Sequence, residues 1–184
     1  MFETCNRRVQ RWVILPMLAA GLVLLVPRPA AAQDSVPFAA DFQGVFQIMF
    51  GAGPDGTDDL RFSGDGIASL LGLSNVNGHT TTRPSATDPL CSDIVTDQVI
   101  LTAANGDELW LVNTGEDCLD FSVPGRIFIR GSGTMQVVGG TGRFSGATGS
   151  GTFDVVAEVT GFVPGGVTGS FAIHFEGSIA PPGE

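Results

Sequence analysis

The sequence predicts an all-β domain, built either as an antiparallel sandwich or as a closed barrel. Apolar residues recur at every second position through most of the chain after residue 40, and glycine-rich turns separate these runs at short intervals. Beyond the N-terminal segment no stretch has the 3.6-residue period of an amphipathic helix. A barrel would have the advantage that closing the sheet removes its exposed edge strands.

The first 32 residues are predicted to be an export signal. A cluster of arginines precedes an apolar run at residues 12–26, and the small residues Ala30 and Ala32 follow it. The run is shorter than the roughly 20 residues that a membrane span needs. We therefore place cleavage after Ala32 and expect a single secreted or periplasmic domain at residues 33–184. The adjacent arginines leave a twin-arginine route open beside ordinary secretion.

The chain that follows the predicted signal is strongly acidic. It keeps five arginines, no lysine and eighteen acidic residues, which gives a formal charge of −13. We expect no nucleic-acid partner, because phosphate binding needs clustered cations. Adhesion to an anionic membrane is disfavoured for the same reason. A solvated acidic surface accounts for the charge.

Two cysteines, Cys91 and Cys118, lie in the predicted mature chain. An exported protein meets an oxidising compartment, so we predict a disulfide between them. Closing a loop of this length stabilises a fold by about 3–4 kcal/mol. A metal pair or a nucleophile is the alternative, but neither cysteine has a CxxC partner or a nearby histidine. We expect no metal and no cofactor.

The first strand is predicted at residues 41–50, where apolar and polar side chains alternate. The apolar residues of its inner face are Phe42, Phe46, Ile48 and Phe50. An acidic loop follows, and its three aspartates offer oxygen ligands for calcium. These are Asp55, Asp58 and Asp59. Their spacing is not that of an EF-hand, and ordinary acidic turn chemistry is the simpler interpretation.

A long second strand is predicted at residues 60–73, with Gly64 and Gly66 as bulge or bend positions. Residues 75–91 are interpreted mostly as a loop, with a short strand near His79. A lone histidine in such a loop is expected to be solvated.

The second half of the chain repeats the strand pattern and brings the total to about eight strands. Further strands are predicted at residues 94–103, 108–112, 125–138, 151–160 and 166–179. The Asn105-Gly106 pair predicts a tight hairpin between the first two of these. A second turn is predicted at residues 113–118.

The last two strands offer one polar pair. If Thr160 pairs with Thr168, Asp154 lies opposite His174 on the face away from the apolar residues. An Asp–His pair can orient an imidazole for proton transfer. The alternative is a cross-strand surface pair of small energetic value.

The segment "VVGGTGRFSGATGSGTF" at residues 137–153 holds six glycines between two strand patterns. A phosphate loop would lead into a helix, and the residues that follow are too rich in glycine for one. A linker would separate two domains, whereas both flanks continue the same pattern. We therefore expect fixed turn geometry that depends on glycine, with Phe144 closing one end of a barrel from inside.

The same segment resembles the "GGTGxF" connection of the allene oxide cyclase and dirigent barrel group. "LTAANGDELWL" from Leu101 is similar to a hairpin of secreted bacterial members, and "RFSGDGIASLLGL" resembles their second strand, with leucine in place of the customary histidine. The likeness covers residues 41–179. It implies an eight-stranded antiparallel closed barrel related to the lipocalin-like calycin folds.

The resemblance implies no single activity, because the group includes cyclases and proteins that guide radical coupling. Plant enzymes of the group use acidic and tyrosine side chains inside the barrel. This chain has no tyrosine and no acidic motif that aligns with theirs, so no catalytic residue is transferred.

The interior of such a barrel is the candidate site. Its predicted lining residues are Phe42, Phe46, Ile48, Phe50, Phe153, Phe171 and Phe175. An eight-stranded barrel is either filled by side chains or wide enough for one small ligand. Three hypotheses follow: a binding protein for a small hydrophobic molecule, a cyclase or isomerase that acts by shape, and an interaction module with a packed core that forms a homo-oligomer.

Overall fold

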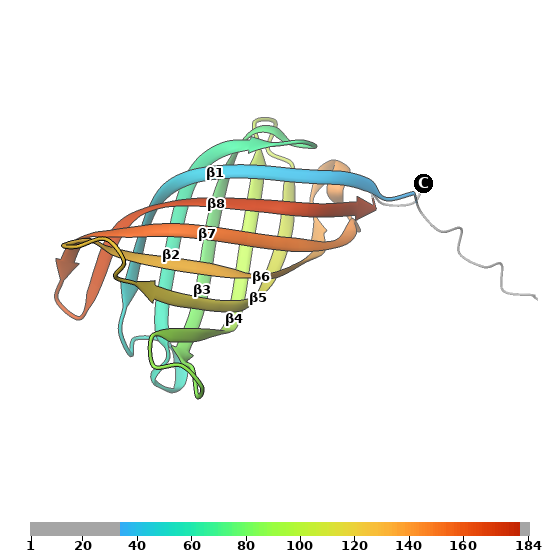
Figure 1. The fold of residues 1–184 in the computed structure, drawn as a ribbon. Coiled ribbons are helices and arrows are strands. Elements are labelled where there is room, and N and C mark those ends of the chain that lie inside the picture. The colour runs from blue at the N-terminus through green and yellow to red at the C-terminus, as the bar shows by residue number, and fades with distance from the viewer. Residues whose placement is uncertain (1–33, 181–184) are drawn as a thin grey trace, which may run out of the picture. The chain divides into compact units, whose positions relative to one another are not determined.

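A computed structural model describes residues 34–180, and the predicted signal at residues 1–32 lies outside them. The described chain forms a closed antiparallel barrel of eight strands, in which each strand pairs with its neighbours in sequence and β1 also pairs with β8 (Figure 1). The strands are β1 (Val36–Met49), β2 (Asp58–Ala68), β3 (Gly72–Pro84), β4 (Cys91–Ala103), β5 (Glu108–Asp120), β6 (Ile127–Gly140), β7 (Thr148–Val163) and β8 (Gly166–Ala180). The fold class predicted from the sequence is confirmed.

Glycines let neighbouring strands of the barrel approach closely. Gly44 of β1 faces Gly64 of β2, and a Cβ on Gly44 would lie 2.0 Å from the carbonyl oxygen of Ser63. Of the bulge or bend predicted at Gly64 and Gly66, the bulge is wrong, because the pairing of β2 with β1 and with β3 runs through both residues without a shift. Their missing side chains serve close backbone contact instead.

One half of the barrel is filled. Its interior is packed with apolar side chains that are almost fully buried, among them Phe38, Phe42, Val76, Leu101, Leu109, Leu111, Met135, Phe175 and Ile179. This half includes the β2–β3, β4–β5 and β6–β7 connections. Burial of this kind is the dominant favourable term in folding.

The glycine-rich β6–β7 connection closes the filled half. It contains the short 3-10 helix η2 (Gly142–Phe144), and the Phe144 side chain is only 5% exposed, as predicted. Gly142 has a φ of 54°, and a Cβ there would lie 1.8 Å from Oδ1 of Asp107. Glycine is required at this position for both reasons. Arg143 forms an ion pair with Asp107 at 3.3 Å.

Strand β3 is the largest error of the sequence-based prediction. Residues 69–71 form the β2–β3 turn, and most of the predicted loop at 75–91 is strand. The inward positions of β3 include the small residues Ser74 and Gly78, so the alternation of apolar and polar residues is weak there. A Cβ on Gly78 would lie 2.0 Å from the ring of Phe62, which occupies that space. Pairing with both neighbours holds β3 in place.

Two further boundaries differ from the prediction. Strand β5 continues through residues 113–118, which were predicted to form a turn, because β6 pairs with it along its whole length. Phe50 is 56% exposed, and the prediction that it points inward is wrong. It follows the end of β1 in a turn, where its N–H donates to the carbonyl of Gly165 at 2.8 Å.

The predicted disulfide is present. Cys91 begins β4 and lies directly opposite Cys118 of β5, with their Cα atoms 4.0 Å apart. The bond joins two strands beside the β3–β4 and β5–β6 loops. None of the helices among the described residues has the length and apolar character that a membrane crossing requires.

Candidate functional site

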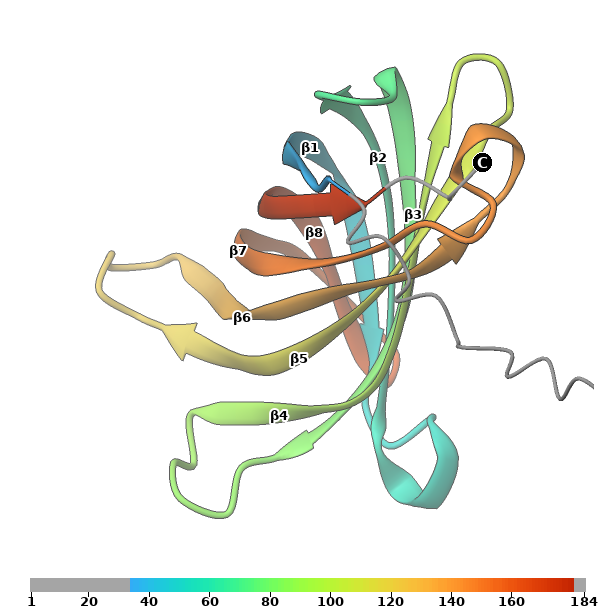
Figure 2. The ribbon, with the colours of Figure 1, turned by 90° about the vertical axis from the view of Figure 1, so that its right-hand side faces the viewer.

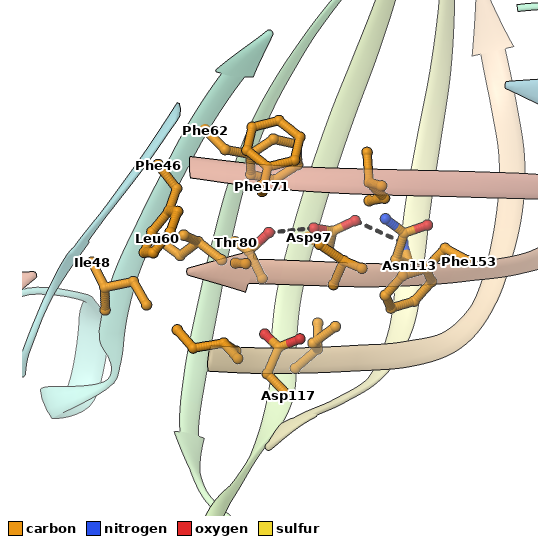
Figure 3. A pocket seen from close by; sticks show the side chains of 15 residues that line it. Phe46, Ile48, Leu60, Phe62, Thr80, Asp97, Asn113, Asp117, Phe153 and Phe171 are labelled. Carbon is orange, nitrogen blue, oxygen red and sulfur yellow. Dashed lines mark hydrogen bonds between the residues drawn. The ribbon is translucent and has the colours of Figure 1, made fainter. Parts of the chain in front are cut away.

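The other half of the barrel contains a cavity of about 70 Å³. It lies near the ends of β1, β2, β4 and β6 that adjoin the β1–β2, β3–β4 and β5–β6 loops. Figure 2 shows the ribbon of these strands and loops. The lining residues are Phe46, Ile48, Leu60, Phe62, Thr80, Ile94, Asp97, Asn113, Asp117, Ile129, Phe153, Val155, Ala157, Phe171 and Ile173 (Figure 3). The walls are therefore mainly aromatic and aliphatic. The polar residues among them, Thr80, Asp97, Asn113 and Asp117, form a small polar cluster.

Four of the interior residues singled out in the sequence line this cavity: Phe46, Ile48, Phe153 and Phe171. Phe42 and Phe175 point inward as well but belong to the packed half. The rings of Phe62 and Phe171 meet edge to face, with centroids 5.3 Å apart. Phe62 was not among the predicted residues.

An irregularity in the pairing of β4 with β5 places Asp97 in the polar cluster. Asp93 pairs with Glu116 and Val99 with Leu111, so five residues of β4 lie opposite four residues of β5. Such a bulge interrupts the ladder and redirects side chains. The Asp97 carboxylate fills the interruption, where it accepts the backbone N–H of Asn113 at 2.8 Å.

Asp97 is held from two sides. The hydroxyl of Thr80, its partner on β3, donates to one carboxylate oxygen, while Asn113 on β5 donates to the other (Figure 3). Burial raises the pKa of Asp97, and the hydrogen bonds from Thr80 and Asn113 oppose that rise. Asp97 therefore has a structural part in joining β3, β4 and β5.

Asp117 is the less constrained carboxylate of the cluster. It lies opposite Gly131 of β6, where a Cβ would lie 2.0 Å from Asp117 Oδ1, so glycine leaves the space that the carboxylate occupies. Burial, followed by the charge of Asp97, raises the pKa of Asp117 to about 6. The Asp117 carboxyl group therefore changes its protonation state close to neutral pH.

Asn113 completes the cluster. Its side chain is 5% exposed, and its Oδ1 atom has no hydrogen-bond partner among the described residues. A buried carbonyl oxygen without a donor costs free energy. An unsatisfied acceptor in the wall of a cavity is what a ligand with a matching donor would relieve.

Both histidines lie outside the barrel. Asp154 is opposite His174 as predicted, although the strands reach that register through a bulge, with Gly161 rather than Thr160 opposite Thr168. The His174 imidazole contacts Asp41 of β1 instead, with Nδ1 2.8 Å from Oδ1. It is a surface pair.

His79 belongs to β3 and not to a loop. Its Nε2 lies 2.9 Å from Oδ2 of Asp59, which also pairs with Arg61 at 2.9 Å. Arg61 first and His79 second lower the pKa of Asp59. The Asp58 carboxylate accepts the N–H of Gly51 at 2.8 Å. Two of the three loop aspartates considered for calcium therefore have protein partners.

The sequence contained a signal for Asp97 that the prediction did not use. Asp97 lies two residues before Val99 and four before Leu101, in a strand whose inner face was evident, so its side chain shares their inward-facing side. Asp117 and Asn113 share the parity of Leu109 and Leu111, but the segment was interpreted as a turn. The sequence does not show that Gly131 makes room for the Asp117 carboxylate, because that depends on the pairing of β5 with β6.

Comparison with known proteins identifies no family. No family model matches the sequence, and no curated protein matches it. Among solved structures, the pterocarpan synthase dirigent protein GePTS1 matches over 83% of this chain and 90% of that chain, at 14% sequence identity and a TM-score of 0.22. A TM-score this low carries no argument about the site, and the barrel is established by its own strand pairing.

Proposed function

We propose that the protein binds a small, mainly hydrophobic molecule in the open half of the barrel. The observation that carries this proposal is a hollow with apolar walls that contains a few convergent polar groups, the usual composition of a ligand site. A barrel packed at both ends would favour the interaction module instead. The hollow half supports the binding hypothesis over that alternative.

The dimensions of the cavity restrict the ligand. An engineered protein cavity that binds benzene measures about 150 Å³, and this one is about 70 Å³. A slim chain therefore fits better than a ring system, with its outer part among the loops at the open end. The polar cluster favours a ligand whose polar group is at one end.

Proton-transfer catalysis by a cyclase or isomerase is the second candidate. Two carboxylates share the cavity, and their surroundings differ: Asp97 accepts hydrogen bonds, whereas Asp117 has a pKa of about 6. A carboxyl group that exchanges its proton near neutral pH suits a general acid or base. An enzyme of this kind would show a pH–rate profile with an inflection near 6 that is lost on Asp117→Asn.

We also propose export and a distant relationship to the allene oxide cyclase and dirigent group. The Cys91–Cys118 disulfide supports an oxidising compartment. The glycine-dependent turn around Gly142 and the buried Phe144 support the relationship, because the motif that resembles that group also forms the closed end of this barrel. Mass analysis of the protein from its own host would detect cleavage after Ala32.

Filling the cavity is expected to abolish binding. Ala157 lines it and is 7% exposed, so Ala157→Phe would place a ring where the ligand lies. Saturation-transfer NMR with 1-hexanol should give a signal with the native protein and none with this variant. Ala172→Phe, the same change on the exposed outer face of β8, should keep the signal. Equal signals from both variants, with both folded by circular dichroism, would place the binding outside the barrel.

A further inference from the structure

The cavity contains two carboxyl groups and no cationic residue in its lining. Asp97 and Asp117 both line it, and the fifteen lining residues include no arginine, lysine or histidine. Burial raises the pKa of Asp97, and the charge of His79 on the outer face of β3 opposes that rise. Four arginines of the described chain are paired with acids elsewhere: Arg61 with Asp59, Arg126 with Glu158, Arg130 with Asp120, and Arg143 with Asp107. A carboxylate in apolar surroundings is costly unless something compensates it.

The free hydrogen-bonding atoms of the cavity are acceptors. The Thr80 hydroxyl and the Asn113 backbone N–H both donate to Asp97. The Asn113 side-chain amide is also hydrogen-bonded to Asp97 and opposes the rise in pKa that burial causes there. What is left is Oδ1 of Asn113, which is buried and has no partner among the described residues, together with the Asp117 carboxylate. A complementary ligand must therefore supply donors and positive charge together.

We propose that the ligand is a hydrophobic amine, bound as its ammonium ion between Asp117, Asp97 and Asn113. An ammonium group has three N–H donors and no acceptor, which matches a cluster that offers acceptors. The hydrocarbon part would contact Phe46, Phe62 and the aliphatic side chains of the opposite wall. This assignment rests on the proposed function and specifies the ligand class of the same cavity.

Other polar groups match the cavity less well. An alcohol supplies one donor and leaves both carboxylates without a counter-charge. A carboxylic acid would bring a third negative charge into the same space, where like charges repel strongly because the surroundings are apolar. The phenylalanine rings of the wall also favour a cation over an anion, since ring faces attract positive charge.

A matched series of six-carbon ligands tests the assignment by titration calorimetry: hexylamine, 1-hexanol and hexanoate. At pH 7.5 hexylamine should bind about tenfold more tightly than 1-hexanol, the advantage expected of a hydrogen bond between charged groups. Hexanoate should not bind. At pH 5 the advantage of hexylamine should shrink, because Asp117, with a pKa of about 6, is then protonated while the amine keeps its charge.

Substitution of Asp117 separates charge recognition from hydrophobic binding. Asp117→Asn should lower the affinity for hexylamine about tenfold and leave that for 1-hexanol unchanged. Asp154→Asn removes the same charge from the exposed outer face of β7 and should change neither. Equal affinity for amine and alcohol, or an Asp117→Asn variant that still prefers the amine, would overturn the amine assignment and leave the proposed function standing.

Two other outcomes are distinguishable in the same experiment. Binding of calcium chloride in competition with hexylamine would assign the cluster to a metal ion and overturn the amine proposal. If neither hexylamine nor 1-hexanol binds, the proposed function fails together with the inference.

Discussion

Removal of the Cys91–Cys118 disulfide is expected to lower the free energy of unfolding by about 3–4 kcal/mol. The bond closes a loop with a sequence separation of 27, and its loss would restore that loop's freedom in the unfolded chain. It also joins β4 and β5 next to the bulge, where the ladder between them is interrupted. A loss of this size corresponds to a fall in melting temperature of about 10 °C for a domain of this length.

The measurement is urea unfolding of the Cys91→Ala/Cys118→Ala double variant beside the native protein. Reductant should bring the native protein to the stability of the double variant and should leave the double variant unchanged. If the native protein keeps its unfolding midpoint after mass analysis shows that the disulfide is reduced, the bond does not stabilise the barrel as described.

Asp117→Asn is expected to stabilise the protein by about 1–3 kcal/mol at pH 7.5. The folded state raises the pKa of Asp117 from 3.8 to about 6, so folding favours the protonated form. Between pH 4 and pH 6 the native protein therefore loses stability as pH rises, and above that range it bears the full cost of ionising a half-buried carboxyl group. Asparagine has a similar shape and no charge, so it avoids this cost. The gain should vanish below pH 4, where the carboxyl is neutral in both states.

Asp120→Asn is a control, because its effect on stability should have the opposite sign to that of Asp117→Asn. Arg130 first, with help from Ser122, lowers the pKa of Asp120 to about 2. This carboxylate stabilises the fold above its unfolded pKa, and the effect disappears as pH falls towards 2. Thermal unfolding at pH 3, 5 and 7.5 compares the three proteins. An Asp117→Asn variant that is less stable than the native protein at pH 7.5, or one with a pH-independent difference, would contradict the described surroundings of Asp117.

The part of the fold that the sequence predicted correctly was the part in which apolar and polar residues alternate strongly. Phe42, Phe46 and Phe171 are large apolar residues on the inner face of strands whose side chains alternate, and their burial follows directly from the pleat of a strand. Strand β3 was predicted mostly as loop because its inner positions include Ser74 and Gly78, residues that single-sequence patterns assign to turns. β3 is held as a strand by its pairing with β2 and β4, and a local sequence pattern does not contain this information.

The polar cluster was harder to predict than the apolar interior, for two reasons. Asp97 points inward because it shares the parity of Val99, but a charged residue inside a barrel contradicts the expectation that inner faces are apolar. Asp117 depends on a strand that continues through a Gly-Glu-Asp sequence and on Gly131, fourteen residues further along the chain. Strand pairing that brings such residues together is a tertiary property.

Native mass spectrometry of the protein purified from its own host tests the central claim most directly. The account predicts a bound small molecule of low mass, apolar in character and carrying an amine, that is lost from the Ala157→Phe variant and retained by Ala172→Phe. A protein that is empty from its host, and that takes up neither hexylamine nor 1-hexanol afterwards, would contradict the account and leave the barrel as an interaction module.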